Sequence, residues 1–141
     1  MRYNSKMDAA RTAISAAENR ALEAVGVFLE GEAINRCPTG VYDDGRVGGN
    51  LKGSISHKTN TTSPKGVVVG AAAKYAVYVE KGTGLYAEDG NGRRTPWFYE
   101  SNIRTGELTK TSGQRPQPFL KPSVTKNLAK IQRLFKEQLK L

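Results

Sequence analysis

The chain has 141 residues, of which 38% are hydrophobic and 25% charged, enough for one globular domain with a modest core. It contains no run of about 18 apolar residues, which excludes a membrane span, and its first residues lack the apolar stretch of a secretory signal. We therefore expect one domain over residues 1–141, made inside the cell. One cysteine, Cys37, and one histidine, His57, cannot form an internal disulfide or a typical zinc site.

The net charge of +9 is unevenly placed. Residues 1–36 carry five basic and five acidic side chains, residues 37–102 eight and six, and residues 103–141 nine and two. Most of the positive charge therefore belongs to the C-terminal part of the chain. Such a patch suits a polyanion or an acidic protein partner, and a solubilising surface explains it equally well.

Residues 8–36 predict a helix whose apolar side chains recur every three or four positions and so share one face. These are Ile14, Ala17, Ala21, Val25 and Phe28. Pro38 ends this helix. Residues 39–53 hold five glycines and almost no apolar periodicity, which predicts a mobile loop. Its Asp43-Asp44-Gly45 lacks the ligand spacing of a calcium-binding helix–loop–helix, so we expect no metal site.

Residues 54–59 and 66–71 predict the two strands of an antiparallel hairpin, joined by a turn-rich link that contains Pro64. Residues 74–81 remain open between two structures. Alternation would place Tyr75, Val77 and Val79 on one side of a strand, whereas helical spacing would pair Tyr75 with Val79. Residues 82–95 predict a second glycine-rich loop.

Trp97-Phe98-Tyr99 predicts a strand by its aromatic content, and a further short strand is expected near Leu108 after a turn. Residues 111–118 break regular structure, and Pro122 suits the first turn of a final helix. The order of elements favours an α+β fold. In this fold a long N-terminal helix and a C-terminal helix pack on a small, mostly antiparallel sheet, with long glycine-rich loops.

The stretch Gly82-x-Gly84-x-x-Ala87 has the glycine spacing of a dinucleotide-binding turn. Such a turn needs a helix that begins at the glycines, because free helix N–H groups hold the phosphates. The residues that follow do not predict a helix, and Glu88 and Asp89 would repel a phosphate. We therefore expect no nucleotide and no other cofactor.

Catalytic chemistry finds little support in the sequence. His57 is expected to be a solvated residue at a strand edge, and Cys37 a small buried hydrophobe. Glu80 is the one acid in an apolar setting, and no second acid is placed to work with it. We expect no catalytic residue, no metal ligand and no enzyme. An enzyme that uses Glu80 or His57 stays open only as a third alternative function.

Three segments occur in a characteristic order: Cys37-Pro38-Thr39-Gly40 with residues 49–55, then residues 75–83, then residues 116–122. Together they resemble the small tail-component family of long-tailed bacteriophages and prophages. Two features differ from the usual pattern of the family. Residues 41–48 interrupt a motif that is normally more compact, and the loop after Thr83 is longer.

The resemblance implies a non-enzymatic virion structural protein of the neck that joins or completes the tail at the head–tail junction. It implies a homo-oligomeric ring, expected to be six-fold, around the DNA channel. The expected partners are other connector and tail proteins, with non-specific contact to passing DNA and no membrane. The expected location is the virion, after assembly in the cytoplasm of the bacterial host.

The resemblance also picks out residues with structural roles. These motif residues are Cys37, Pro38, Gly49, Asn50, Leu51, Ser54, Tyr75, Tyr78, Glu80, Gly82, Thr83, Pro118 and Phe119. We expect Asn50 to cap the turn into the first strand, and Phe119 to anchor the last helix in the core. Glu80 could bind backbone N–H groups or an arginine and so fix the turn at Gly82, or it could be an ordinary surface acid.

The two long loops, residues 41–53 and 82–95, are the candidate contact regions of a ring. Tyr42, Tyr86 and Trp97 are candidate subunit-interface residues, with core packing as the competing role for Trp97-Phe98-Tyr99. Candidate residues for lining a DNA channel are Arg46, Lys52, Arg93 and Arg94, together with the lysines of the last helix. The alternative function is that of a small basic nucleic-acid-binding protein that uses its C-terminal helix.

Overall fold

The structure is a computed structural model that describes residues 2–140, with side chains described for residues 6–140. Its longest element is the helix α1 (Arg2–Arg36). The other elements are α2 (Asn50–Gly53), β1 (Ile55–Asn60), β2 (Gly66–Ala71), α3 (Ala76–Lys81), the 3-10 turn η1 (Gly84–Tyr86), β3 (Trp97–Asn102), β4 (Glu107–Thr111), α4 (Leu120–Thr125) and α5 (Leu128–Gln138). The expected α+β fold is confirmed.

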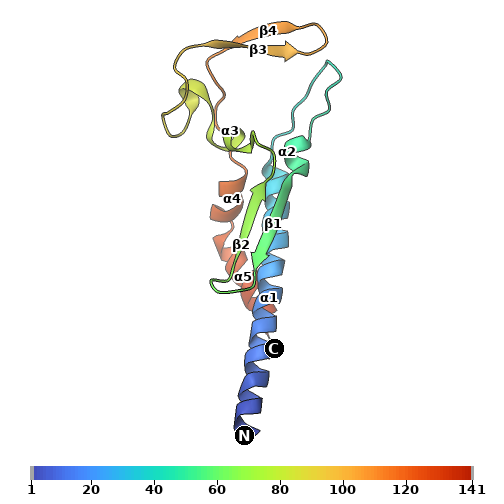
Figure 1. Cartoon of the computed structure of the whole chain (residues 1–141), viewed down its shortest axis with the longest axis vertical. Helices are drawn as coiled ribbons and strands as arrows, with labels where there is room; N and C mark the ends of the chain where they lie inside the picture. The colour runs from blue at the N-terminus through green and yellow to red at the C-terminus, as the bar shows by residue number, and fades with distance from the viewer. Residues whose placement is uncertain (1, 141) are drawn as a thin grey trace.

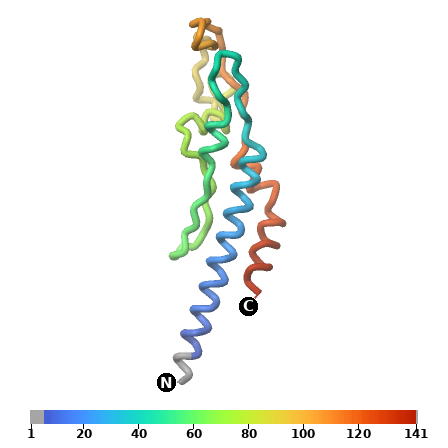
Figure 2. The backbone as a smooth tube through the Cα atoms, turned by 90° about the vertical axis from the view of Figure 1, so that its right-hand side faces the viewer, coloured from blue at the N-terminus to red at the C-terminus, as the bar shows by residue number. Residues whose placement is uncertain are grey.

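The helix α1 forms the middle layer of an elongated molecule. The β1–β2 ribbon packs along one side of it and α4 and α5 along the other (Figure 2). Its N-terminal end extends past both neighbours (Figure 1), and the side chains of residues 6–14 are exposed. No helix within residues 2–140 has both the length and the apolar character needed to cross a bilayer.

The strands form two separate antiparallel ribbons, where the sequence led us to expect one small sheet. The hairpin predicted from residues 54–59 and 66–71 is confirmed as β1–β2, in which His57 lies opposite Val69. The second ribbon, β3–β4, lies across the far end of the molecule, away from the first (Figure 1). In the described residues α1 packs against β1 and β2, and α4 and α5 pack against α1.

Three local predictions are resolved by the structure. Residues 74–81 contain the helix α3, and the strand alternative is therefore wrong. The loop predicted over residues 39–53 ends in the one-turn helix α2, which is too short to show periodicity. The single final helix is divided into α4 and α5, with Lys126 and Asn127 between them.

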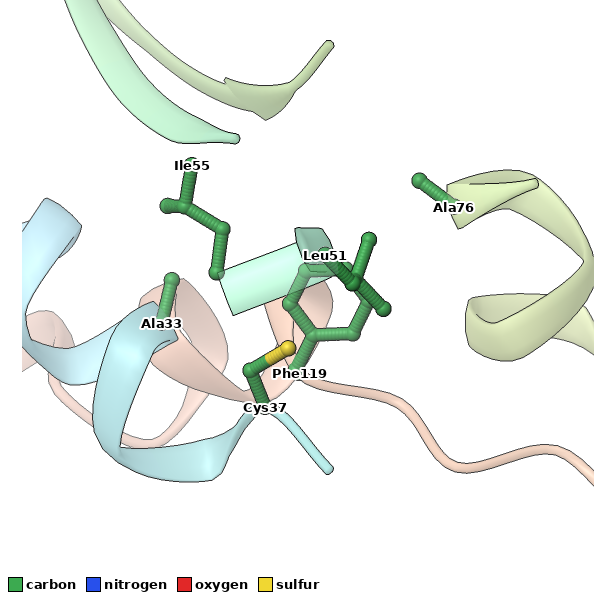
Figure 3. Packing of buried hydrophobic residues seen from close by; sticks show 6 residues of the cluster. All are labelled: Ala33, Cys37, Leu51, Ile55, Ala76 and Phe119. Carbon is green, nitrogen blue, oxygen red and sulfur yellow. The ribbon is translucent and has the colours of Figure 1, made fainter. Parts of the chain in front are cut away.

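The main core lies where α1 ends and α4 begins. It consists of Ala33, Cys37, Leu51, Ile55, Ala76 and Phe119 (Figure 3). Phe119 is 0% exposed and is one of the largest fully buried side chains, immediately before the first residue of α4. The expected burial of Cys37 is confirmed, and that burial raises the pKa of its thiol. Small side chains along α1, Ala17 and Ala21 among them, let the neighbouring layers approach closely.

His57 joins the β1–β2 ribbon to α1, so the expectation of a solvated histidine is wrong. Its Nδ1 contacts Glu30 Oε2, and its Nε2 lies 2.8 Å from Glu23 Oε1. The ring lies against Gly26, where any Cβ would collide with it. A neutral imidazole has only one N–H, so carboxylates at both nitrogens stabilise the imidazolium. The hydrogen bonds to Glu30 and Glu23 therefore raise the pKa of His57, and the hydrogen bond to His57 lowers the pKa of Glu23.

This cluster predicts that stability depends on pH. The contribution of His57 is complete below its ordinary pKa of 6.5 and is lost as the pH rises through the raised pKa of the folded state. The contribution of Glu23 is complete above its ordinary pKa of 4.5 and is lost as the pH falls through the lowered value. We expect urea denaturation to show less stability at about pH 9 than at about pH 6, and a smaller difference in His57→Gln. Equal pH dependence in both proteins would contradict an imidazolium at this position.

Candidate subunit interface

The loop of residues 39–49 and the β3–β4 ribbon form one unit at the end of the molecule opposite the N-terminus, here called the apical unit (Figure 1). Asp44 connects the two parts. Its buried carboxylate accepts hydrogen bonds from the Ile103 N–H at 2.9 Å and from Arg46 Nε at 2.8 Å. Arg46 also donates to the Ser101 carbonyl at 2.7 Å. Hydrogen bonding by Arg46, helped by Ile103, holds the pKa of Asp44 well below its ordinary value.

The loop within the apical unit is closed on itself. Gly48 lies so close to the Gly40 carbonyl that a Cβ at Gly48 would overlap it. The Tyr42 ring packs under the Arg46 guanidinium, whose carbon lies 4.4 Å from the ring centroid. These contacts and the Asp44 hydrogen bonds fix a loop whose composition had predicted mobility. The Asp44 carboxylate, which a calcium ion would need as a ligand, already accepts hydrogen bonds from N–H donors.

The apical unit exposes most of its large apolar side chains. The exposed fractions are 94% for Val41, 83% for Val47, 64% for Phe98, 63% for Leu108 and 55% for Ile103. In the ribbon, Phe98 lies opposite Lys110 and Glu100 opposite Leu108, which places Phe98 and Leu108 on the same face. Core packing is therefore wrong for Phe98 and Tyr99, because about half or more of each side chain is exposed. Large exposed apolar side chains in one region of a surface make that region a candidate contact site.

A pocket of about 350 Å³ lies between α3 and the loop of residues 82–95. This loop and the loop of residues 39–49 lie on opposite sides of the molecule in Figure 1. Its lining includes the apolar side chains of Val77, Tyr78, Ala87 and Trp97, together with the polar side chains of Thr83 and Asn91. Lys81, Asp89 and Arg93 also line it. The Arg93 guanidinium carbon lies 5.5 Å from the centroid of the Trp97 ring. The pocket is therefore an apolar hollow with charged groups beside it.

The glycines at positions 82 and 84 serve a close crossing of two chain segments. Both have positive φ, +78° and +61°, which other residues adopt with strain. A Cβ at Gly84 would overlap the carbonyl of Ser112, and the Leu85 N–H donates to that same carbonyl at 2.9 Å. The helix α3 precedes these glycines, in the reverse of the order that a dinucleotide turn requires.

Glu80 ties α3 to α4. Its Oε2 accepts from the N–H of Phe119 at 2.7 Å and of Leu120 at 3.0 Å, and its Oε1 accepts from the N–H of Lys121 at 2.9 Å. The sequence left backbone N–H groups or an arginine open as partners of Glu80, and the structure shows that the partners are backbone N–H groups. The segment that Glu80 fixes is the start of α4, not the turn at Gly82. Its carboxylate satisfies N–H groups that a helix start leaves without partners.

The other motif residues mostly surround the core. Asn50 begins α2, but no side-chain hydrogen bond caps that helix, and Ser54 holds its end instead. Ser54 Oγ donates to the Leu51 carbonyl at 2.7 Å and accepts from the Ala73 N–H at 3.2 Å. Pro38, Gly49 and Tyr75 line a second cavity beneath the loop of residues 39–49, here called the apical loop. Tyr78 lines the apolar pocket, and Thr83 Oγ1 accepts a hydrogen bond from the Gln114 N–H at 2.9 Å. Pro118 is exposed beside Phe119.

The structure separates the candidate interface and DNA residues into two groups. Arg46 and Lys52 belong to the segment that follows α1, and Arg93 and Arg94 to the loop on the opposite flank (Figure 1). Arg46 is paired with Asp44, and Lys52 is half-buried, whereas Arg93 and Arg94 are exposed. The interface candidates divide in the same way: Tyr42 lies on the apical loop, Trp97 lines the pocket, and Tyr86 packs under Arg115 next to that pocket.

Sequence reasoning missed the residues that organise this surface. The sequence indicates no role for Asp44 beyond that of a calcium ligand, which its spacing excludes, and no role for Val41 and Val47. A buried carboxylate inside a glycine-rich loop has no local sequence signal, because its partner Ile103 is 59 positions away. Two valines in a loop without periodicity are the signal that the sequence offers, because apolar residues outside a predicted strand or helix face can be exposed for a partner as well as buried in the core.

Fold and surface together describe a small α+β protein with exposed apolar side chains at the end opposite its N-terminus. Comparison with protein-family profiles matches residues 2–82 to the family described as "Bacteriophage HK97-gp10, putative tail-component". The match covers more than half of the chain, and the chain belongs to this family of phage tail components. Searches of curated proteins and of solved structures found no significant match.

Proposed function

We propose that this tail component acts at the head–tail junction, where it joins or completes the tail as a subunit of a ring around the DNA channel. The observation that carries the proposal is the apical unit, which holds exposed apolar side chains in a fixed arrangement. Monomeric proteins rarely expose large contiguous apolar patches, and such patches serve contacts with partners. In this role the protein is structural and transforms no substrate.

The kind of contact that the molecule offers supports a ring. The apical loop, residues 39–49, and the apolar pocket are two different surfaces, and the loop of residues 82–95 that lines the pocket lies on the opposite side of the molecule from the apical loop (Figure 1). A contact between different surfaces of identical subunits is heterologous, and it produces a closed ring when the rotation between subunits divides a full turn. A contact of one surface with itself would stop at a dimer.

Positive charge suits a subunit close to DNA. The net charge is +9, and α5 with its flanking residues carries the exposed cations Lys126, Lys130, Arg133, Lys136 and Lys140. In the part of the chain that the structure describes, none of these five cations forms an ion pair. Contacts of this kind attract phosphates independently of base sequence and weaken as salt increases. They allow DNA to pass without being held.

The same cations support the alternative function, a free-standing nucleic-acid-binding protein that uses α5. The two functions differ in the assembly state of the protein that binds DNA. A ring subunit would bind DNA weakly as a monomer and would self-associate at high concentration. A free-standing binder would bind DNA at micromolar concentration or tighter as a monomer at about physiological salt.

Cryo-electron microscopy of the assembled phage particle tests the location directly. We expect density for this chain in the neck, as a ring through which the channel runs. Sedimentation of the purified protein with and without duplex DNA then tests the second function. Absence of the chain from the neck, together with tight DNA binding by the monomer, would replace the first function with the second.

A further inference from the structure

We infer that the apical loop of one copy inserts Val41 and Val47 into the apolar pocket between α3 and the loop of residues 82–95 of a second copy. This inference rests on the proposed ring and names the contact that would build it. Each copy would then insert its own loop into the pocket of one neighbour and bind the loop of the other neighbour in its own pocket.

The loop has the properties of a preorganised insertion element. Val41 and Val47 are the two most exposed large apolar side chains of the described residues. The Gly40–Gly48 approach closes the loop, and Asp44 fixes it to the β3–β4 ribbon. A loop that is already ordered loses little conformational freedom on binding, so more of the apolar burial contributes to affinity.

The pocket has complementary properties. Its volume of about 350 Å³ is at the small end of the range for binding pockets, which suits a pair of short branched side chains better than a large ligand. Val77, Tyr78 and Trp97 offer apolar surface, and Tyr78 and Val77 are themselves about half exposed in the single copy. Covering them would remove apolar area from water on both partners.

The charges of the two surfaces are also complementary. Asp43 lies between the two valines on the loop, is exposed, and forms no ion pair within residues 2–140 as described. Lys81 and Arg93 line the pocket, together with one acid, Asp89, which accepts from the Asn91 N–H at 2.9 Å. The inserted carboxylate therefore meets two cations and one anion that already has a local partner. Such complementarity favours this orientation of the loop over others.

The placement of the two surfaces determines the assembly. The apical loop and the loop of residues 82–95, which lines the pocket, lie on opposite sides of the molecule in Figure 1, so the contact joins two copies. The contact is head-to-tail and leaves one free loop and one free pocket on every open chain of subunits. Only closure into a ring satisfies all of them.

The test uses one variant on each surface and a matched control. Val41→Asp alters the loop and leaves the pocket intact, and Tyr78→Asp does the reverse. Val68→Asp, at an exposed valine of β2 remote from both surfaces, is the control. We expect sedimentation to show self-association of the wild type and of Val68→Asp, and an association at least about tenfold weaker for each of the two surface variants.

Mixing the two surface variants gives a sharper result. A 1:1 mixture contains one intact loop and one intact pocket for each pair, so we expect dimers and no larger species. Folding of each variant is checked by its urea denaturation midpoint. Assembly of both surface variants like the wild type, or failure of the mixture to form dimers, would overturn the contact while leaving the ring intact.

Two other outcomes distinguish an error in the contact from an error in the proposed ring. Normal rings of both variants, combined with loss of these variants from the phage particle, would mean that another tail protein occupies the pocket, and the inference would be wrong. A wild type that remains monomeric at the highest attainable concentration and is absent from the neck would overturn the proposed ring itself, and the contact with it.

Discussion

Phe119→Ala is expected to lower the free energy of unfolding by about 3 to 5 kcal/mol, because it removes a fully buried aromatic ring and leaves a cavity. The ring fills the space between α1, α2 and α3, where Cys37, Leu51 and Ala76 belong to the same cluster (Figure 3). Few other single changes remove as much buried apolar area. Urea denaturation followed by circular dichroism measures the change in stability.

Phe98→Ala is the matched control, since it removes the same side chain from a position that is 64% exposed. We expect this control to change the stability by less than about 1 kcal/mol. Phe119→Leu serves if the alanine variant does not fold, because it keeps part of the buried volume. Similar stability losses in Phe119→Ala and Phe98→Ala would mean that the core is not organised around Phe119.

The second large effect is expected at Glu80. Glu80→Ala should lower the free energy of unfolding by about 2 to 3 kcal/mol, because three N–H groups at the start of α4 lose a charged acceptor. Glu80→Gln should lose less, since its amide oxygen can still accept. Hydrogen exchange of the Leu120 and Lys121 amides should accelerate in both variants, which separates a local role in α4 from a general loss of stability.

Glu88→Ala provides the comparison for Glu80. Glu88 is an exposed acid only eight positions further along the chain, and its backbone N–H donates to the Lys81 carbonyl at 2.8 Å. Its substitution should therefore leave both the stability and the exchange of the α4 amides close to those of the wild type. Unchanged exchange at Leu120 and Lys121 in Glu80→Ala would rule out the role assigned to Glu80.

The elements that the sequence predicted well are those with a strong local signal. The long helix shows an apolar face over many turns, and the β1–β2 hairpin combines β-branched residues with a turn-rich link. Periodicity could not decide residues 74–81, because six helical residues are too few to distinguish the two periods. The split of the strands into two ribbons depends on how the chain folds back, and local composition carries no information about that.

Much less of the candidate site could be predicted. The aromatic residues Tyr42 and Trp97 were recognisable as interface candidates by their type, and both lie on the surfaces described above. The residues that shape these surfaces act through distant partners. Glu80 bonds to residues about 40 positions away, Asp44 to one 59 away, and His57 to two on α1. Such pairs become visible only when the fold brings them together.

The unsupported end of α1 has a mechanical consequence. Residues 2–14 lie N-terminal to the first buried residues of the helix, and at 1.5 Å per residue they form an arm of about 20 Å. A tilt of about 10° where α1 is packed between the ribbon and α5 would displace the tip of that arm by about 3 Å. The molecule therefore contains a lever, through which a small adjustment between its layers becomes a larger shift at a distant point of an assembly.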